Sequence, residues 1–509
     1  MIVSPTLQID KSASPTEIAG QLQAYVEQAA EEGRPLHEVE RTIFDTVLRI
    51  GYAATEQFLR GQGDGDLGQM ITSEQGQTFE RSDKPVNRPL RTVFGLHSIQ
   101  AFVYAPGSHQ KIALRPVDAR LQLPPGRASY LFEEFSQYFC VDQAFGQATG
   151  SLDRVLRQKV SVDSLERINE RLGEQADRFL DELPTPSADE EGEILVFTGD
   201  AKGVPMFNQD AASWAAFEEP PDRPGNRRMA TLAGVYSVGR YVRSPEEIVA
   251  ALFRDGQRPP RGDRPKPRFK HIRGSFVRVY DQDTDDAMVV SGAFEAFSWA
   301  EQQVATRLQP QQPLVRLMDG QPSLWTAAEA CLESAPADGT VDILDILHVS
   351  SYVWRAAKVF HTTFEHREAF ARDRLLRILR GEVHGVMAGL RQMATKRKLP
   401  SKARKEINIV CGYFEKNAER MRYDEYLQAG YPIASGVIEG ACRHFVKDRM
   451  ERSGMRWRFP GAQAMLNVRA VFLSSYWDDF HQYRIEQEQQ GLHKHRNLIA
   501  DYQPTNTPV

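Results

Sequence analysis

The chain has 509 residues, of which 41% are hydrophobic and 26% are charged, a composition typical of globular proteins that bury several cores. Its net charge of −5 argues against a simple nucleic-acid coat protein, since such proteins are usually basic, but it allows local basic surfaces. The sequence contains neither the roughly 18 uninterrupted apolar residues of a membrane span nor a signal-peptide pattern. These features predict a cytoplasmic protein with no membrane partner.

The four cysteines, Cys140, Cys331, Cys411 and Cys442, are scattered without a C-x-x-C pair. This spacing indicates neither a disulfide framework nor a zinc site. We expect buried thiols.

The N-terminal part of the chain predicts a helical region followed by a small β-rich module. Helical periodicity runs through residues 1–85, with Ser14 and Pro15 at the entry of the first helix. Alternating β-branched and aromatic residues between 90 and 105 predict a hairpin.

Residues 127–186 return to a helical pattern. The short connection K-V-S-V-D, with Ser161 or Asp163 as N-cap, is spaced as in a helix-turn-helix. In that interpretation a DNA-reading helix carries Ser164, Arg167, Asn169 and Arg171. An ordinary three-helix bundle explains the pattern equally well.

The acidic, proline-containing segment 184–193 predicts a domain boundary. A short buried strand is expected next, over 194–198, ending at Gly199 and Asp200. Lys202 beside Asp200 is suited to a phosphate as a point charge. Taken alone, Asp200 is explained better as a turn residue.

Further strands and loops follow the first strand. The pattern predicts a strand at 230–238, a helix at 245–253, and a basic, proline-rich segment over 254–273. We favour a flexible loop that tracks phosphates for this segment over a solvated surface excursion. A later apolar strand, 314–318, ends in Asp319 and Gly320 before another helix.

The next strand brings Asp345 and, three residues on, His348. A structural pair explains this D-x-x-H spacing as well as a catalytic one does. Residues 349–428 then read as helical.

In the segment 432–459, the carboxylate of Glu439 is followed by a series of basic residues. Glu439 stands between two glycines in the first turn of a predicted helix, where the helix dipole favours a negative charge. The basic residues behind it are Arg443, Lys447, Arg449, Arg452, Arg456 and Arg458. An exposed helix with ordinary ion pairs explains this segment, taken alone, equally well.

Asp200, Asp319 and Glu439 together offer the oxygen ligands that Mg²⁺ or Mn²⁺ prefers. Two such ions about 3.5–4 Å apart activate a water or a 3′-hydroxyl and stabilise the leaving oxygen of a phosphoryl displacement. The three carboxylates therefore predict chemistry on a nucleic-acid backbone.

Four motifs of the chain resemble those of the DDE transposases of bacterial insertion sequences, closest to the ISKra group. These motifs are T-G-D-A-K-G-V-P-M, L-M-D-G-Q-P-S-L-W, D-I-L-H-V and S-G-V-I-E-G-A-C-R-H-F-V-K-D-R-M-E-R-S-G-M-R-W. The resemblance covers roughly residues 90 to 480 and rests most on the long motif around Glu439.

The resemblance implies an α+β (mixed α/β) fold: a ribonuclease-H-like catalytic core with an all-α insertion, preceded by helical and helix-turn-helix DNA-binding regions. The implied domains are 1–85, N-terminal helical; 86–126, small β-rich module; 127–186, helix-turn-helix-like; 187–350, first part of the core; 351–428, all-helical insertion; 429–482, core helix with the catalytic Glu; and 483–509, flexible tail.

Carried over position by position, the resemblance makes Asp200, Asp319 and Glu439 the catalytic, metal-binding triad for two Mg²⁺ or Mn²⁺ ions. Asp345 and His348 are implied as an organising pair behind it. A competing register makes Asp345 the second acid; we prefer Asp319, because its Asp-Gly dipeptide ends an apolar strand and begins a helix.

The implied activity is binding of double-stranded DNA at the element's terminal inverted repeats, cleavage of one strand and joining of the freed 3′-hydroxyl to target DNA. The implied DNA-binding residues are Arg167, Arg171, Lys202, Arg443, Lys447, Arg449, Arg452 and Arg456. A homo-oligomer is expected when two ends are paired, and association with the nucleoid when DNA is bound.

Two alternatives remain open at this stage. One is a DNA-binding relic that has lost catalysis, and the other is a nuclease that cuts without joining. The family's zinc-binding knuckle after the hairpin is missing, since F-V-Y-A-P-G-S-H-Q-K-I-A-L-R contains no cysteine, so no zinc is expected there.

Overall fold

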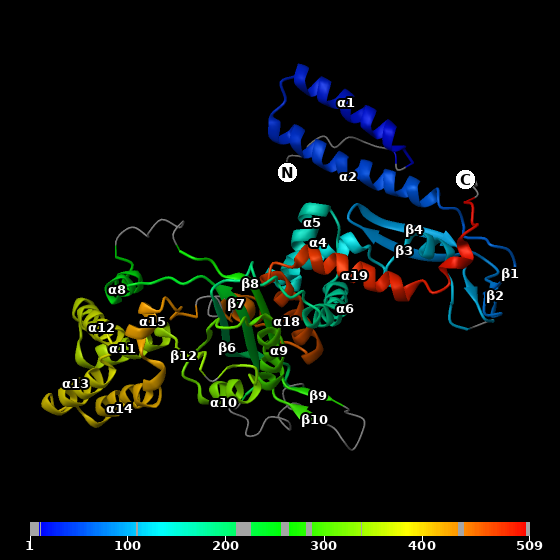
Figure 1. Ribbon diagram of the computed structural model, residues 1–509. Coiled ribbons are helices and arrows are strands. Elements are labelled where there is room, and N and C mark those ends of the chain that lie inside the picture. Colours follow the sequence, from blue (N-terminus) through cyan, green and yellow to red (C-terminus); the bar gives the residue numbers. More distant parts are fainter. Residues whose placement is uncertain are drawn as a thin grey trace. The chain divides into compact units, whose positions relative to one another are not determined.

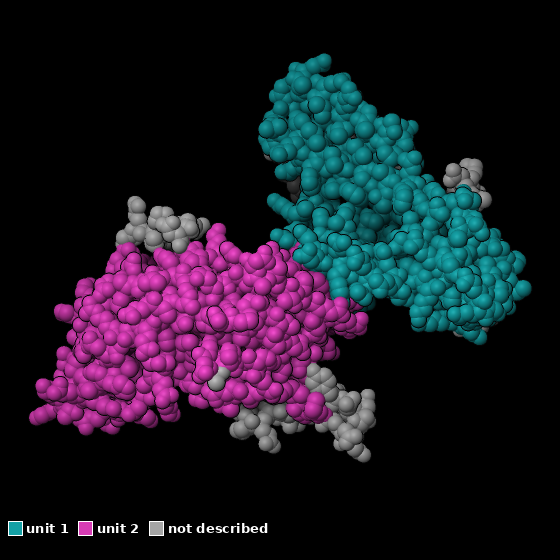
Figure 2. All heavy atoms as spheres, viewed as in Figure 1, with its two compact units in different colours: residues 1–168, 478–509 teal, residues 169–477 magenta. Residues whose placement is uncertain are grey.

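The computed structural model divides the chain into two compact units, coloured separately in Figure 2. The first comprises Met1–Ile168 and Asp478–Val509, and the second comprises Asn169–Trp477. The structure describes residues 10, 12–107, 110–209, 225–255, 264–280, 288–336, 338–435, 442–452 and 454–504.

The first unit begins with two long helices, α1 (Pro15–Glu31) and α2 (Leu36–Arg60). The predicted entry of the first helix is confirmed, because Ser14 forms a capping box with Glu17. The strands that follow are β1 (Met70–Thr72), β2 (Thr78–Arg81), β3 (Val86–Thr92), β4 (Gly95–Ala101) and β5 (Tyr104–Ala105). The β3–β4 pair is the predicted hairpin, and it begins a few residues earlier than the alternation indicated.

Helices predominate in the next part of the chain: α3 (Pro116–Leu121), α4 (Tyr130–Asp142), α5 (Phe145–Leu156) and α6 (Val162–Asp181). Ser161 accepts a hydrogen bond from the backbone N–H of Ser164 at 3.3 Å, which confirms one of the two predicted caps. The division between the two units falls within α6. The helices expected here are therefore present, while DNA binding by them stays a prediction.

The C-terminal segment differs from the flexible tail that the sequence indicated. It forms α19 (Trp477–Leu492) and the 3₁₀ turn η3 (Arg496–Ile499). The hydroxyl of Tyr502 accepts from the N–H of Gly65 at 2.8 Å and donates to the carbonyl of Gln62 at 3.0 Å. These bonds lie within the first unit and join the end of the chain to the loop after α2.

The second unit is built on a mixed sheet with strand order β12-β11-β6-β7-β8 (Figure 1). Its strands are β6 (Ile194–Pro205), β7 (Arg227–Val238), β8 (Arg268–Ser275), β11 (Leu314–Met318) and β12 (Thr340–Leu344). β6, β11 and β12 run parallel, whereas β7 and β8 are antiparallel to their neighbours. A separate two-stranded pair consists of β9 (Arg278–Tyr280) and β10 (Met288–Val290).

Two expectations about these strands need correction. The first strand was expected to end near Thr198, but β6 continues to Pro205, because its antiparallel pairing with β7 extends that far. The basic segment 254–273 ends in a strand rather than a loop, since its last residues form β8. β8 lies at the sheet edge, where proline-rich flanks are tolerated.

Helices cover both faces of this sheet. The remaining helices of the unit are α8 (Pro245–Phe253), α9 (Gly292–Arg307), α10 (Pro322–Cys331), α11 (Ile346–Phe360), α12 (Phe364–Leu379), α13 (Val383–Lys396), α14 (Ser401–Lys416), η1 (Ala418–Arg420), α15 (Tyr423–Gln428), the π-helical turn η2 (Cys442–Lys447), α17 (Asp448–Met450) and α18 (Phe459–Leu473). On one face, Phe297 of α9 packs edge-on against Phe197 of β6, with ring centroids 5.0 Å apart. On the other, Val349 and Val353 of α11 join the core formed with Val196.

Helices α11 to α15 gather beside the β12 edge of the sheet in Figure 1 and share one hydrophobic core with it. The all-helical character predicted for 349–428 is therefore confirmed. The mixed α/β class is confirmed as well, since a five-stranded mixed sheet is covered by helices.

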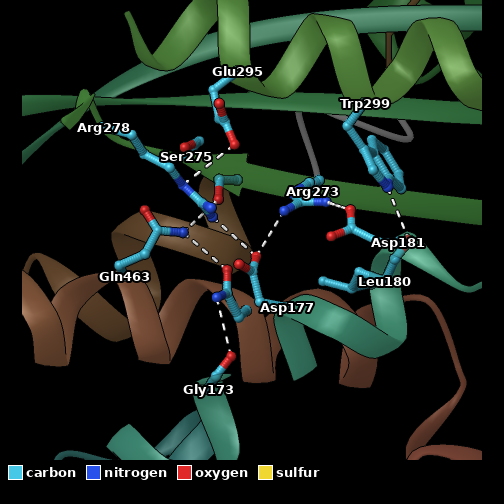
Figure 3. Close-up of polar contacts among 12 residues, drawn as sticks. Gly173, Asp177, Leu180, Asp181, Arg273, Ser275, Arg278, Glu295, Trp299 and Gln463 are labelled. Atoms are coloured by element: carbon cyan, nitrogen blue, oxygen red, sulfur yellow. Dashed lines mark hydrogen bonds and ion pairs between the residues drawn. The ribbon is translucent and has the colours of Figure 1, made fainter. Parts of the chain in front are cut away.

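The second half of α6 is anchored to this core by the ion pairs of Figure 3, which centre on the buried Arg273. Arg273 of β8 pairs with Asp177 at 2.7 Å and with Asp181, and Arg278 pairs with Asp177 at 2.9 Å. The indole N–H of Trp299 donates to the carbonyl of Leu180 at 2.9 Å. Residues 169–181, which the sequence grouped with the helix-turn-helix-like region, thus belong to the second unit.

None of the helices in the described part of the chain has the length and apolar character needed to cross a membrane. Cys140, Cys331 and Cys411 are buried, as expected.

Candidate functional site

Three aspartates form one row across the parallel strands of the sheet. Gly199 of β6 is in register with Met318 of β11, and Met318 is in register with Leu344 of β12. The residue after each of these three is an aspartate. The row consists of Asp200, Asp319 and Asp345.

All three aspartates occupy the face of the sheet that α11 covers. Side chains alternate along a strand, so Asp200 shares a face with Val196, which belongs to the core beneath α11. Residues in register on neighbouring parallel strands share a face and lie about 4.8 Å apart. Asp200 and Asp319 are therefore direct neighbours, and Asp345 lies one strand further along.

The backbone around Asp319 is held firmly. Its Oδ1 accepts the N–H of Gln321 at 3.0 Å, and its carbonyl accepts the indole N–H of Trp325 at 2.6 Å. The guanidinium of Arg420 covers the Trp325 ring, 4.1 Å from its centroid. The Asp319 side chain itself is only partly buried, so it remains accessible to a ligand.

Asp345 differs from Asp319 in being fully buried. Its Oδ1 accepts the N–H of Leu347 at 2.8 Å and so caps α11, and its Oδ2 accepts the hydroxyl of Ser435. Burial raises the pKa of the Asp345 carboxyl, and the bonds from Ser435 and Leu347 oppose that rise. Nδ1 of His348 lies 3.9 Å from Oδ2, an ion-pair distance that fits the expected D-x-x-H pair.

Glu439 lies outside the described residues. The described segments on either side of it contact the same face of the sheet. Before it, the carbonyl of Ile433 accepts the N–H of Ile346 at 3.0 Å, next to the Ser435 bond. After it, the ring of Phe445 packs against Gly274 of β8. Its Cε1 lies 3.0 Å from the position that a Cβ on Gly274 would take.

The predicted phosphate-binding residues near the row fall into different environments. Lys202 lies two residues beyond Asp200 on the same face, and its Nζ is 3.9 Å from Glu451 Oε2. Arg227 of β7 pairs with the same carboxylate and donates to the carbonyl of Gly203 at 2.8 Å. Two partly exposed cations therefore share one carboxylate beside the row.

The basic residues after Glu439 divide into exposed and buried ones. Lys447 and Arg456 are exposed, and Arg452 is partly buried and donates to the carbonyl of Asp448 at 2.6 Å. Arg449 is 1% exposed, and its guanidinium lies 5.0 Å from the Trp457 ring centroid. Contrary to the expectation of a DNA-binding residue, its charge is therefore not exposed to solvent. The side chain of Arg443 is outside the described part of the chain.

Trp457 is buried and extends the β6 edge. Its N–H donates to the carbonyl of Pro205 at 3.0 Å, and its carbonyl accepts the N–H of Phe207 at 2.9 Å. Trp325 is buried as well. Both indoles therefore pack in the core.

On α6, Arg167 is exposed and pairs with Asp163 at 3.4 Å. Arg171 is partly buried, and Asn169 is 1% exposed. Asn169 therefore faces the protein interior and is not placed to read bases, contrary to the helix-turn-helix interpretation.

The donor set of the row fits a hard divalent ion. Two neighbouring carboxylates on one face supply the oxygen ligands that Mg²⁺ and Mn²⁺ prefer. Among the residues that the structure describes, no three His, Cys, Asp or Glu side chains are close enough to hold a metal by themselves. A site at the row would therefore take a further ligand from elsewhere, for which Glu439 is the candidate.

A scan against models of protein families finds no match, and a search of curated proteins finds no significant match.

Two contributions to the site were missed by the sequence interpretation. The motif around Glu439 did not indicate that the hydroxyl of Ser435 donates to Asp345. Tyr413 of α14 lies against Gly320 beside Asp319, and no local pattern in the sequence indicates this contact.

Proposed function

We propose that the chain is a DDE-type transposase, which binds the terminal repeats of an insertion sequence and catalyses metal-dependent DNA cleavage and strand transfer. The observation that carries the proposal is that Asp200 and Asp319 each follow the last residue pair of the β6–β11 register, Gly199 with Met318, and that both segments flanking Glu439 contact the same face of the sheet.

The architecture supports a ribonuclease-H-like core. The resemblance implies a mixed sheet with flanking helices and a helical insertion before the last acid. The second unit has a five-stranded mixed sheet, and helices α11 to α15 stand between its last strand and the Glu439 segment. The order of these parts in the chain is the one expected.

The connection to Ser435 supports Glu439 as the third acid. Ser435 is bonded to Asp345 in the row, and Glu439 follows it by four residues, which can span at most about 14 Å. Asp345 lies about two strand spacings, or roughly 10 Å, from Asp200. The chain is therefore long enough for Glu439 to contribute to the same site.

Asp319 is the better second acid. Both oxygens of Asp345 already accept hydrogen bonds, from Leu347 and Ser435, and its side chain is buried. Asp319 is adjacent to Asp200 and partly accessible. We therefore assign Asp345 to tethering the Glu439 segment and capping α11.

In the proposed reaction Asp200, Asp319 and Glu439 would hold Mg²⁺ or Mn²⁺. Such ions, when bound, activate the attacking oxygen and stabilise the leaving oxygen at a phosphodiester. Lys202, which lies two residues beyond Asp200 on the same face, would neutralise a DNA phosphate near the row.

The test is divalent-dependent cleavage of a duplex that carries the element's terminal repeat. Asp319→Asn should reduce cleavage by about a hundredfold or more, because loss of groups that only support metal ligands already costs 10–100-fold. The control is Asp338→Asn, the same substitution at an exposed aspartate before β12. Equal cleavage by both variants contradicts the assignment, and cutting without joining identifies a nuclease.

A further inference from the structure

Helix α14 of the helical insertion places Tyr413 directly against the turn that follows Asp319. A Cβ built on Gly320 would lie 2.4 Å from Cε2 of the Tyr413 ring and 2.7 Å from its hydroxyl oxygen. Such distances leave no room for a side chain at position 320. Glycine is therefore needed here because of the approach of Tyr413.

The Tyr413 ring is itself held in place. It stacks on Tyr352 of α11, with centroids 3.8 Å apart and planes inclined by only 3°. At the end of α14 the carbonyl of Tyr413 accepts the Nδ2 of Asn417 at 2.9 Å. The ring thus forms a fixed surface against the turn rather than a mobile side chain.

The other positions of the turn have partners of their own, through Gln321 and Trp325. Gly320 is the remaining position, and its contact is Tyr413. Burial, together with the charge of Asp319, raises the pKa of the Tyr413 phenol.

We propose that Tyr413 is a positioning residue for Asp319, supplied by the helical insertion: its ring and hydroxyl fix the Asp319-Gly320 turn and thereby aim the carboxylate at a divalent ion. This inference rests on the proposed function, since it takes Asp319 as a metal ligand. It gives the insertion a direct part in the metal affinity of the site.

The test measures Mn²⁺ binding to the full-length protein by electron paramagnetic resonance of the free ion. Tyr413→Phe removes one hydroxyl and should weaken Mn²⁺ binding about tenfold, the usual effect of losing a group that supports a metal ligand. The divalent concentration for half-maximal DNA cleavage should rise by the same factor.

The matched control is Tyr426→Phe. The Tyr426 hydroxyl, on α15 of the same insertion, donates to the carbonyl of Asp342 of β12 at 2.9 Å and does not contact the Asp319-Gly320 turn through any described hydrogen bond. Its loss should lower stability and leave Mn²⁺ affinity unchanged. If Tyr413→Phe leaves Mn²⁺ affinity unchanged, as Tyr426→Phe is expected to do, Tyr413 has only a structural role and the inference is wrong.

A double-mutant cycle tests the contact itself. Gly320→Ala should weaken Mn²⁺ binding in the wild-type background and much less in a Tyr413→Ala background, where the added methyl has space. If the effects of the two substitutions on Mn²⁺ affinity simply add, Gly320 and Tyr413 are not coupled and the inference is wrong.

Failure of the proposed function has a different signature. If the protein binds Mn²⁺ through Asp319 but does not cut DNA, the function fails while Mn²⁺ affinity still decides the role of Tyr413. If Asp319→Asn binds Mn²⁺ as tightly as wild type, or if the wild type binds none, both proposals are wrong.

Discussion

His271 of β8 is a buried imidazole that the fold keeps neutral. It lies between Gln303 at 2.6 Å and the hydroxyl of Tyr476 at 2.9 Å. Burial first, and the charge of Arg307 second, lower the pKa of His271 to about 4. Protonation would therefore place an unfavourable charge in the core.

This low pKa predicts that acid destabilises the protein through His271. Because the unfolded imidazole has a pKa of 6.5, its contribution is complete above pH 6.5 and is lost as the pH falls from 6.5 to about 4, by about 3 kcal/mol. Urea unfolding between pH 4 and 7 measures this loss. His271→Gln should show a weaker pH dependence than wild type.

The exposed His384 is the control for this measurement. His384→Gln should keep the wild-type pH dependence. If His271→Gln and wild type lose stability in parallel as the pH falls, the imidazole does not carry the effect.

Among single residues, the sequence indicated the positions of the aspartates, but it did not indicate which residues contact them. Strand ends followed by Asp correctly located Asp319, and the D-x-x-H spacing located the pair of Asp345 with His348. Tyr413 and Ser435 reach the row from distant segments, so their contacts depend on tertiary packing that no local period encodes. Arg449 was expected to be exposed, but its guanidinium is buried against the face of the Trp457 ring.

Among the elements, α6 and α18 approach each other closely at a small residue. A Cβ on Gly173 would lie 2.4 Å from the Cα and the Cβ of Ala464. Gly173→Ala should therefore force the helices apart and cost about 1–3 kcal/mol of unfolding free energy, as overpacking does. Chemical denaturation monitored by circular dichroism measures the change.

A second helical glycine of the same unit serves as the comparison. Gly389 of α13 has no other atom of the described residues within 4 Å of its Cβ position. Gly389→Ala should stabilise by about 0.5–1 kcal/mol, since alanine is the better helix former. If both variants change stability in the same direction, the α6–α18 contact is not as close as described.

Most elements of the second unit follow from local patterns, and the exceptions have physical reasons. α8 and β11 lie at the residues predicted for them, and α10 follows Asp319 and Gly320 as expected. β6 runs further than its apolar run because backbone pairing with β7 continues past Asp200. The C-terminal segment is ordered in part because the hydroxyl of Tyr502 forms hydrogen bonds with the backbone of Gly65 and Gln62. The polar composition of the segment does not indicate these contacts.

For the whole molecule, a net charge of −5 means that the proposed DNA binding would have to use local cationic surfaces. Each neutralised phosphate contributes about −0.9 to the slope of log affinity against log salt. Removing the charges of the exposed Lys447 and Arg456 together should therefore make that slope shallower by about two. Filter binding from low to high salt measures the slope.

Lys358, exposed on α11, provides the control. Lys358→Gln should leave the slope unchanged. An unchanged slope in the Lys447→Gln, Arg456→Gln variant would show that the segment after Glu439 does not contact the DNA backbone.

The most direct test of the central claim is strand cleavage by Glu439→Gln beside wild type, with binding to the same terminal-repeat duplex followed in parallel. The account predicts that wild type cuts at the repeat end with Mg²⁺ or Mn²⁺, and that the variant binds the duplex but does not cut it. Cleavage by the variant at the wild-type rate would contradict the assignment of Glu439. Binding without cleavage by either protein, under any divalent ion, would identify a DNA-binding relic.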